Sequence, residues 1–134
     1  MEIRLAKPED LPQILTHDLW ITKDVLAGKI GRGEVAVCIE NGEFIGWLRW
    51  GLFWDNTPFL SMLHLLPEYR DRGFGTKAMA FWEEKMQQQG YSVLMTSTSS
   101  AETAQYFYQK LGYTAVGSFA LPGEPLELIF IKTL

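Results

Sequence analysis

The 134 residues, of which 47% are apolar and 21% charged, have the length and composition of one globular domain with its own core. The formal net charge of −4 argues against nucleic acid as the main partner, because phosphate binding favours a basic face; it is compatible with a cationic acceptor. Residues 1–4 lack the apolar region of a signal peptide, and no apolar run approaches the length of a membrane span, so we expect a cytoplasmic protein.

The first half of the chain predicts a strand, two helices and a hairpin. The expected elements are a strand over 2–6, a short helix from Pro8 to Leu15, a second helix capped by Thr22 and stopped by Gly31 and Gly33, and strands over 34–40 and 44–54. Asn41-Gly42 between the last two strands is a favoured two-residue hairpin turn. Cys38 is the only cysteine, which excludes an internal disulfide, and its apolar strand predicts an unreactive buried thiol.

The second half predicts two helices alternating with strands. The expected elements are a turn over 55–58, a strand over 59–66, a helix over 75–89 with Ala78, Phe81, Trp82 and Met86 as its apolar stripe, a strand over 91–98, a helix capped by Ser99 or Ser100, and strands over 113–120 and 126–131. This order of elements predicts a mixed sheet with helices on both faces.

The segment from Leu63 to Lys77 carries the strongest functional signal. An apolar strand runs into a turn with two arginines and two glycines, Arg70, Arg72, Gly73 and Gly75, and the turn opens into a helix. Backbone N–H groups at a helix start form a cradle for anions, glycines let the main chain approach closely, and arginines suit phosphate. The pattern predicts a pyrophosphate-binding loop, although a glycine turn before a helix can also be a plain connection.

Gly73-x-Gly75-x-x-Ala78 also satisfies a loose dinucleotide fingerprint. That alternative requires an acidic residue about 20 positions later to bind the ribose, where this chain has Met95 inside an apolar run. A dinucleotide-dependent oxidoreductase is therefore disfavoured.

Two ordered motifs resemble the Gcn5-related N-acetyltransferase (GNAT) family. Arg70-x-x-Gly73-x-Gly75, preceded by Leu63-x-Leu65-x-Pro67, is similar to the acetyl-CoA loop of that family. The run from Phe107 to Tyr113 is similar to its second signature. The resemblance covers essentially the whole chain and implies one N-acetyltransferase domain over residues 1–134, with a mixed, mostly antiparallel sheet of about seven strands flanked by four helices.

The resemblance also implies which residues bind acetyl-CoA. Main-chain groups of Leu63 and Leu65 would hold the thioester arm, which lies along the fourth strand in the family. The pyrophosphate would be bound by Arg70, Asp71, Arg72, Gly73, Phe74, Gly75 and Thr76, and Arg72 or Lys77 would reach its outer oxygens. The family often has an asparagine seven residues before its tyrosine, where this chain has Ala101, so Ser99, Ser100 or a backbone group would have to compensate.

Tyr108 occupies the position of the general acid of the family. A phenol with a pKa near 10 is protonated at neutral pH and can donate a proton to a departing thiolate. The alternative is a packing role, because Tyr106, Phe107 and Tyr108 adjoin one another.

The general base is left open. Many relatives have a glutamate on the fourth strand, but residues 59–66 contain no carboxylate. His64 is the titratable group of that strand, and imidazole is a natural base near neutral pH. The other candidates are Ser61 holding a water molecule, Asp55, Glu124 and Glu127. Trp54, His17 and Trp20 are candidates for lining the acceptor site.

These observations predict an acetyl-CoA-dependent N-acetyltransferase, a transferase that passes the acetyl group directly to a primary amine of a small molecule or peptide. No metal, nucleic acid or membrane partner is expected, and a homodimer is left open. The alternative is a non-catalytic acyl-CoA-binding or sensor domain, which the missing strand carboxylate and Ala101 favour.

Overall fold

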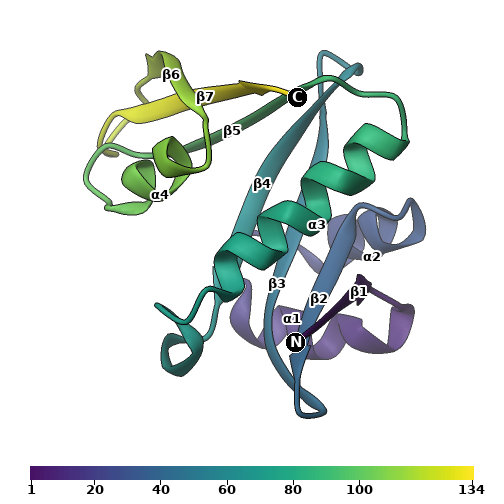
Figure 1. Cartoon of the computed structure of the whole chain (residues 1–134). Coiled ribbons are helices and arrows are strands. Elements are labelled where there is room, and N and C mark those ends of the chain that lie inside the picture. The colour runs from purple at the N-terminus through teal and green to yellow at the C-terminus, as the bar shows by residue number, and fades with distance from the viewer. The chain divides into compact units, whose positions relative to one another are not determined.

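The computed structural model describes all 134 residues and contains the predicted elements in the predicted order (Figure 1). The elements are β1 (Glu2–Leu5), the 3-10 helix η1 (Pro8–Asp10), α1 (Leu11–His17), α2 (Lys23–Gly31), β2 (Val35–Glu40), β3 (Glu43–Phe53), β4 (Thr57–Leu65), the 3-10 helix η2 (Pro67–Tyr69), α3 (Phe74–Gln88), β5 (Val93–Ser99), α4 (Ala104–Lys110), β6 (Thr114–Phe119) and β7 (Glu127–Thr133). No helix is both long and apolar enough to cross a membrane.

The strands form one seven-stranded sheet in the order β1-β2-β3-β4-β5-β7-β6. β1 with β2, β2 with β3, β5 with β7 and β6 with β7 pair antiparallel, whereas β4 and β5 run parallel and pair at Phe59↔Met95 and Leu60↔Thr96. Asn41 and Gly42 both have positive φ angles, as a tight hairpin turn requires. The expected fold class, a mixed and mostly antiparallel sheet with four helices, is confirmed.

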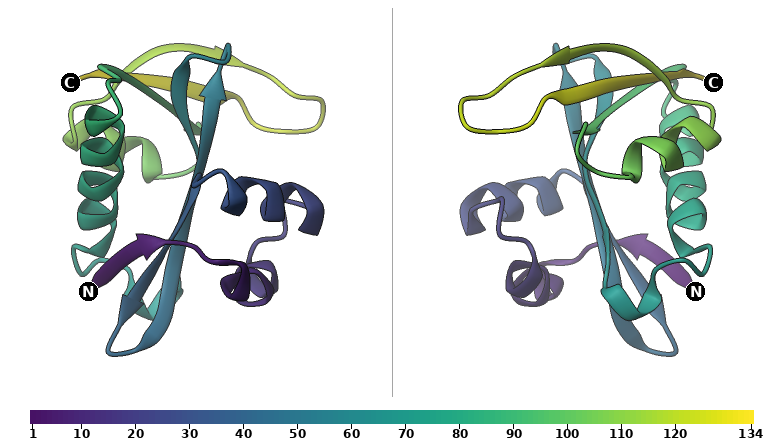
Figure 2. Two further views of the ribbon diagram at one scale, coloured as in Figure 1. Left: turned by 90° about the vertical axis from the view of Figure 1, so that its right-hand side faces the viewer. Right: turned by 90° about the vertical axis from the view of Figure 1, so that its left-hand side faces the viewer.

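Contacts within the chain define two compact units. The first consists of Met1–Gly51 and Met62–Phe81, and the second of Leu52–Ser61 and Trp82–Leu134. In the first unit, α1 and α2 lie on one side of β2 and β3, and the start of α3 lies on the other side (Figure 2). The core under α1 and α2 is formed by Ala6, Ile14, Leu26, Ile30, Val35, Val37 and Trp47.

The second unit has its own buried residues around β5 and β7. Leu94 and Thr96 of β5 and Phe130 of β7 are almost completely buried. The ring of Tyr108, from α4, lies 6.1 Å from that of Phe130. Tyr113 donates a hydrogen bond to Glu83 of α3 at 2.7 Å. The contact of Tyr108 with Phe130 packs α4 against β7.

Some predicted boundaries were wrong for identifiable reasons. The first helix is a 3-10 turn continued by α1 to His17, and β4 begins at Thr57 because the turn before it is shortened by positive φ angles at Trp54 and Asp55. The N-cap of α4 is Thr103 rather than Ser99 or Ser100. The Ser99 hydroxyl instead accepts a hydrogen bond from the backbone N–H of Ala101 and shapes the turn before the helix.

Candidate functional site

The turn between β4 and α3 has the backbone conformation that its sequence predicts. Gly73, immediately before the helix, has a φ angle of +82°. A Cβ atom at this position would meet no atom within 4 Å, so the left-handed backbone, not crowding, requires glycine here. The backbone N–H of Lys77 bonds to the carbonyl of Gly73. The N–H groups of Phe74, Gly75 and Thr76 precede this bond, so they lack acceptors within the helix and can bind an anion.

Basic side chains surround the start of α3. The guanidinium of Arg72 lies 5.1 Å from the centre of the Phe74 ring and 5.5 Å from that of Tyr69. The Lys77 ammonium lies 5.9 Å from the Phe74 ring. Arg72 and Lys77 are exposed, whereas Phe74 is buried, so the two cations are the side chains here that a ligand can reach from solvent. Asp71 has a φ angle of +59° and belongs to the turn itself.

Arg70 contacts β4 in this structure. Its Nε donates a hydrogen bond to the carbonyl oxygen of Leu65 at 2.9 Å, and its Nη2 lies 3.2 Å from Nε2 of His64. The sequence predicted a phosphate contact for this arginine. The observed contact shows a second use of the same side chain, which satisfies a main-chain carbonyl of β4.

The β4 backbone at Leu63 and Leu65 points away from β3. The N–H of Leu66 bonds to Ile45 of β3 at 2.8 Å, and the carbonyl of the preceding residue therefore points in the opposite direction. Leu63 shares this orientation because a strand repeats every two residues. β3 approaches closely on the other side, where a Cβ at Gly46 would lie 2.4 Å from the carbonyl oxygen of His64. The two leucines proposed to bind the thioester arm thus direct polar backbone groups to the side free of β3.

His64 projects toward α1 and α2. Its ring lies 4.9 Å from that of Trp47. Burial, and then the positive charge of Arg70, lower the pKa of His64 below its usual 6.5. The contact with Arg70 favours the tautomer in which Nε2 accepts a hydrogen bond and Nδ1 carries the proton. His64 is therefore neutral at pH 7, but Nε2 can act as a base only after Arg70 moves.

Tyr108 is 7% exposed and packs between aromatic rings. Phe107, Tyr113 and Phe130 lie 5.3, 5.8 and 6.1 Å away by ring centres. Burial raises the pKa of Tyr108, and the hydroxyl of Thr96 opposes this shift to a smaller extent. The Thr96 hydroxyl also donates to the carbonyl of Leu60 on β4 at 3.0 Å. The phenol therefore stays protonated throughout the neutral range, as a general acid must, while its ring also contributes to packing.

The remaining candidate bases differ in their surroundings. Glu127 of β7 accepts a hydrogen bond from the Ser97 hydroxyl of β5 at 2.7 Å and is half-buried. Ser61, Asp55 and Glu124 are exposed. Glu127 is thus the one carboxylate of this set with a defined neighbour.

The candidate acceptor residues lie on exposed turns or on the α1–α2 side. Trp20 and Trp54 are both 80% exposed. His17 stacks on Phe44 at 5.7 Å and lies 6.2 Å from the Trp47 ring. Within the first unit, His17, Trp47 and His64 therefore form one aromatic group.

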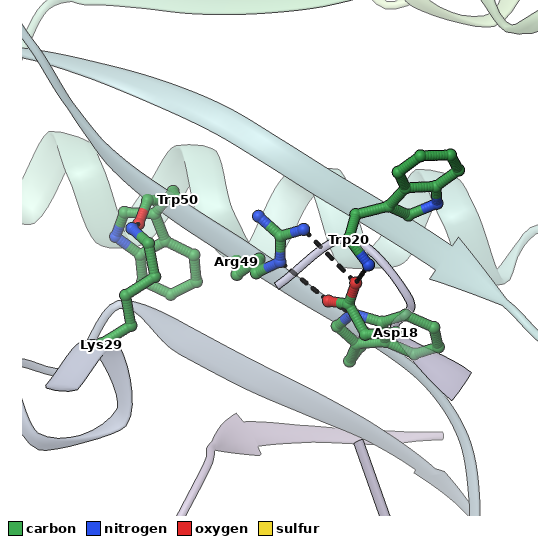
Figure 3. Close-up of polar contacts among 6 residues, drawn as sticks. Asp18, Trp20, Lys29, Arg49 and Trp50 are labelled. Carbon is green, nitrogen blue, oxygen red and sulfur yellow. Dashed lines mark hydrogen bonds and ion pairs between the residues drawn. The ribbon is translucent and has the colours of Figure 1, made fainter. Parts of the chain in front are cut away.

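A buried ion pair beside this group was missed by the sequence analysis. Asp18, just after α1, accepts a hydrogen bond from Nε of Arg49 at 2.8 Å (Figure 3). It accepts another from Nε1 of Trp47 at 3.0 Å. It also accepts one from the backbone N–H of Trp20 at 3.1 Å. The available signal was an arginine inside an otherwise apolar strand, which requires a partner when it is buried.

Residues 4–113 match the model of the acetyltransferase (GNAT) family. No curated protein sequence matches the chain significantly. Among solved structures, a GNAT-family acetyltransferase from Bacillus cereus is 21% identical, with a TM-score of 0.80 over 98% of this chain and 96% of that one. The PaiA N-acetyltransferase from Thermoplasma acidophilum, in complex with coenzyme A, is 18% identical with a TM-score of 0.82, over 99% and 98%. The ribosomal-protein-S18-alanine N-acetyltransferase from Escherichia coli is 16% identical with a TM-score of 0.83, over 98% and 92%.

The family model covers most of the chain, including the β4–α3 turn and the segment around Tyr108. The chain therefore belongs to the GNAT acetyltransferase family. Its expected class, an acetyl-CoA-dependent N-acyltransferase, is confirmed by this membership, and the solved structures share its fold.

Proposed function

We propose that residues 1–134 act as a single N-acetyltransferase domain that transfers the acetyl group of acetyl-CoA directly to a primary amine of a small molecule or peptide. The observation that carries this proposal is the start of α3, where the turn with Gly73 leaves three successive N–H groups for a pyrophosphate. One similar structure is a complex with coenzyme A, and another is named as acetylating a ribosomal protein.

In the proposed reaction the neutral amine attacks the thioester carbonyl. A new C–N bond forms, the C–S bond breaks, and the amine proton passes to a base. The backbone groups of Leu63 and Leu65 hold the thioester arm, and a strand N–H near Leu65 stabilises the charge that develops on the carbonyl oxygen. Tyr108 supplies the proton that the departing thiolate takes up.

The cofactor residues have distinct roles in this proposal. The N–H groups of Phe74, Gly75 and Thr76 bind the pyrophosphate, while Gly73 and Asp71 set the turn that orients them. Arg72 adds charge at the outer oxygens. Arg70 has to leave the Leu65 carbonyl before the thioester arm can pair with it, which makes it available to the phosphates.

The proposal is tested by binding and turnover on the purified chain. Isothermal calorimetry is expected to show acetyl-CoA binding, and thiol release is expected with at least one member of a panel of amino acids, polyamines, aminoglycosides and peptides. Absence of acetyl-CoA binding at millimolar concentration would rule the proposal out.

A second candidate is a non-catalytic acyl-CoA-binding or sensor domain. Two observations favour it: β4 carries no carboxylate, and Nε2 of His64 is engaged by Arg70. This candidate predicts acetyl-CoA binding without thiol release for every amine in the panel.

A further inference from the structure

The α1–α2 side of β3 holds more positive than negative charge. Three cations, Lys29, Arg32 and Arg49, lie with two carboxylates, Asp18 and Glu34. The side chains of Arg49 and Lys29 are only 9% and 15% exposed. Arg49 pairs with Asp18, and Lys29 shares Glu34 with the exposed Arg32, so these five groups carry a net charge of +1 that a bound anion would balance.

Arg49 has a hydrogen-bonding edge to offer. Asp18 accepts from Nε at 2.8 Å and from Nη2 at 3.4 Å, which leaves Nη1 for another acceptor. Figure 3 shows the remaining terminal nitrogen directed away from Asp18. Because Asp18 and its bonds to Trp47 and Trp20 hold the guanidinium in place, little ordering cost remains for an anion that binds there.

Lys29 adds the second charge. Its Nζ donates to the carbonyl of Trp50 and lies 3.8 Å from Glu34, which is bonded more closely by Arg32 at 2.9 Å. A Cβ at Gly51 would lie 3.1 Å from this Nζ, so the ammonium lies against β3 two residues beyond Arg49. Burial, and the charges of Arg32 and Arg49, lower the pKa of Lys29, which an anion placed beside it would reverse.

The position of this group relates it to β4. Asp18 bonds both Arg49 and Trp47, and the Trp47 ring contacts the His64 ring between Leu63 and Leu65. An amine bound beside β4 and an anion bound at Arg49 of β3 would therefore lie on neighbouring strands of the first unit. A second cation on the acceptor would be repelled by Lys29 and Arg49, which disfavours polyamines.

We propose that Arg49 and Lys29 bind the carboxylate of the acceptor, so that the acceptor is an amino acid. This inference rests on the proposed function, since it assigns the acceptor class of the same reaction. A charge-assisted bond to a partly buried carboxylate corresponds to about a 10- to 100-fold effect on affinity.

The test uses N-acetyl amino acids and the matching N-acetyl amino acid amides, which differ in the carboxylate and need no turnover to bind. Binding is followed by ligand-detected NMR in buffer free of phosphate and carboxylates. At least one acid is expected to bind ten times more tightly than its amide. Equal binding of acid and amide, or no binding by any acid, would overturn the proposal.

Variants connect this preference to the two cations. Lys29→Gln removes a charge but can still donate to Trp50, and Arg49→Lys keeps a cation beside Asp18 but removes the planar fork. In both variants the ratio of the affinity for the acid to that for the amide should fall about tenfold or more. Lys23→Gln is the matched control, because it removes one positive charge from an exposed position of the same helix, outside these ion pairs; it should keep the preference. Unchanged preference in both test variants contradicts the assignment, whether or not Arg49→Lys lowers the melting temperature.

Kinetics separate this inference from the proposed function. Thiol release with amino acid amides or polyamines at least equal to that with amino acids would refute the carboxylate site and leave the transferase intact. Absence of acetyl-CoA binding would instead refute the transferase, while the NMR comparison would still decide whether the carboxylate binds.

Discussion

At the scale of single residues, Tyr108 packs against aromatic rings and also carries the hydroxyl proposed as the general acid. Tyr108→Phe keeps the ring against Phe130 and removes only the hydroxyl. If that hydroxyl protonates the thiolate, turnover should fall about 10²–10⁴-fold while acetyl-CoA affinity stays nearly unchanged. Initial rates, calorimetry and melting temperature measure the three quantities.

Tyr106→Phe is the matched control, since Tyr106 lies on the same helix and is 57% exposed. The pH profile gives a further readout. An acid acts while protonated, so its contribution is lost as pH rises through its pKa, and burial places that loss above pH 10. A fully active Tyr108→Phe would leave the tyrosine with a packing role alone.

His64 and Arg70 are electrostatically coupled. Arg70→Ala removes one of the charges that hold the pKa of His64 down, so this pKa should rise toward 6.5 and stay below it because burial persists. His17 also lowers the pKa of His64 and Asp18 raises it, and neither changes in this variant. An NMR titration of the His64 ring protons measures the shift. Arg72→Ala should leave the pKa of His64 unchanged. A fall in the pKa of His64 in Arg70→Ala would contradict the observed contact.

The sequence predicted residue identities better than residue contacts. The glycine loop and Tyr108 were recognisable because their roles depend on backbone conformation and local register. The Asp18–Arg49 pair joins residues 31 positions apart, and the bond between Arg70 and the Leu65 carbonyl depends on a side-chain rotamer. Neither leaves a local pattern in the sequence.

At the scale of elements, the close approach of β3 and β4 depends on Gly46. In Gly46→Ala the new methyl would lie 2.4 Å from the His64 carbonyl oxygen and 3.1 Å from the Leu65 Cα, both backbone atoms that cannot rotate away. We expect a loss of unfolding free energy of about 3 kcal/mol, the upper end for overpacking. Urea titration measures it.

Gly31→Ala is the control for Gly46→Ala. A Cβ at Gly31, in the last turn of α2, meets nothing within 4 Å, and alanine is the better helix former. Its stability should be unchanged or higher. Equal stability of the two variants would show that β3 and β4 separate more easily than their packing indicates.

The start of α3 should depend on its glycine more than on any single arginine. Gly75→Val places a Cβ and two methyl groups beside the N–H groups proposed to bind the pyrophosphate, so acetyl-CoA binding should be lost without unfolding. Arg70→Ala should weaken binding by about 1.5–3 kcal/mol if its phosphate bond is charge-assisted. Calorimetry compares the two.

Ala80→Val, at an exposed position of the same helix, controls for the cost of a β-branched residue in α3. It should bind acetyl-CoA normally. A larger loss from Arg70→Ala than from Gly75→Val would mean that side-chain charge, not backbone, dominates the loop.

Element types were predictable because apolar periodicity and turn residues are local. Boundaries were less so. β4 begins two residues early because Trp54 and Asp55 adopt positive φ angles, which sequence rarely indicates for residues other than glycine, and Ser99 shapes a turn where a helix cap was expected.

At the scale of the whole molecule, the single thiol reports on opening of the fold. Cys38 is fully buried, and burial raises its pKa to about 12. At pH 8 a thiol reagent should therefore modify it only when β2 is exposed, at a rate that increases with urea in parallel with the loss of circular dichroism. Complete modification in denaturant sets the endpoint of one group per chain. Rapid labelling of the folded protein would mean that this part of the sheet opens on its own.

The arrangement of strands and helices followed from the order of elements and the two family motifs. The distribution of charge on the α1–α2 side of β3 did not follow from the sequence. A net charge of −4 suggested a cationic acceptor, whereas the α1–α2 side of β3 gathers cations, because net charge carries no information on where charges meet in space.

The position of Arg70 also affects how the protein behaves in solution without acetyl-CoA. Strand backbone without a partner is a template on which another chain can add a strand, and natural proteins protect such places with charged side chains. Arg70 places a guanidinium on the Leu65 carbonyl, which points away from β3. We therefore expect the arginine to act as a gatekeeper against self-association between turnovers, with Arg70→Ala forming larger particles in light scattering when acetyl-CoA is withheld and returning to monodispersity when it is added.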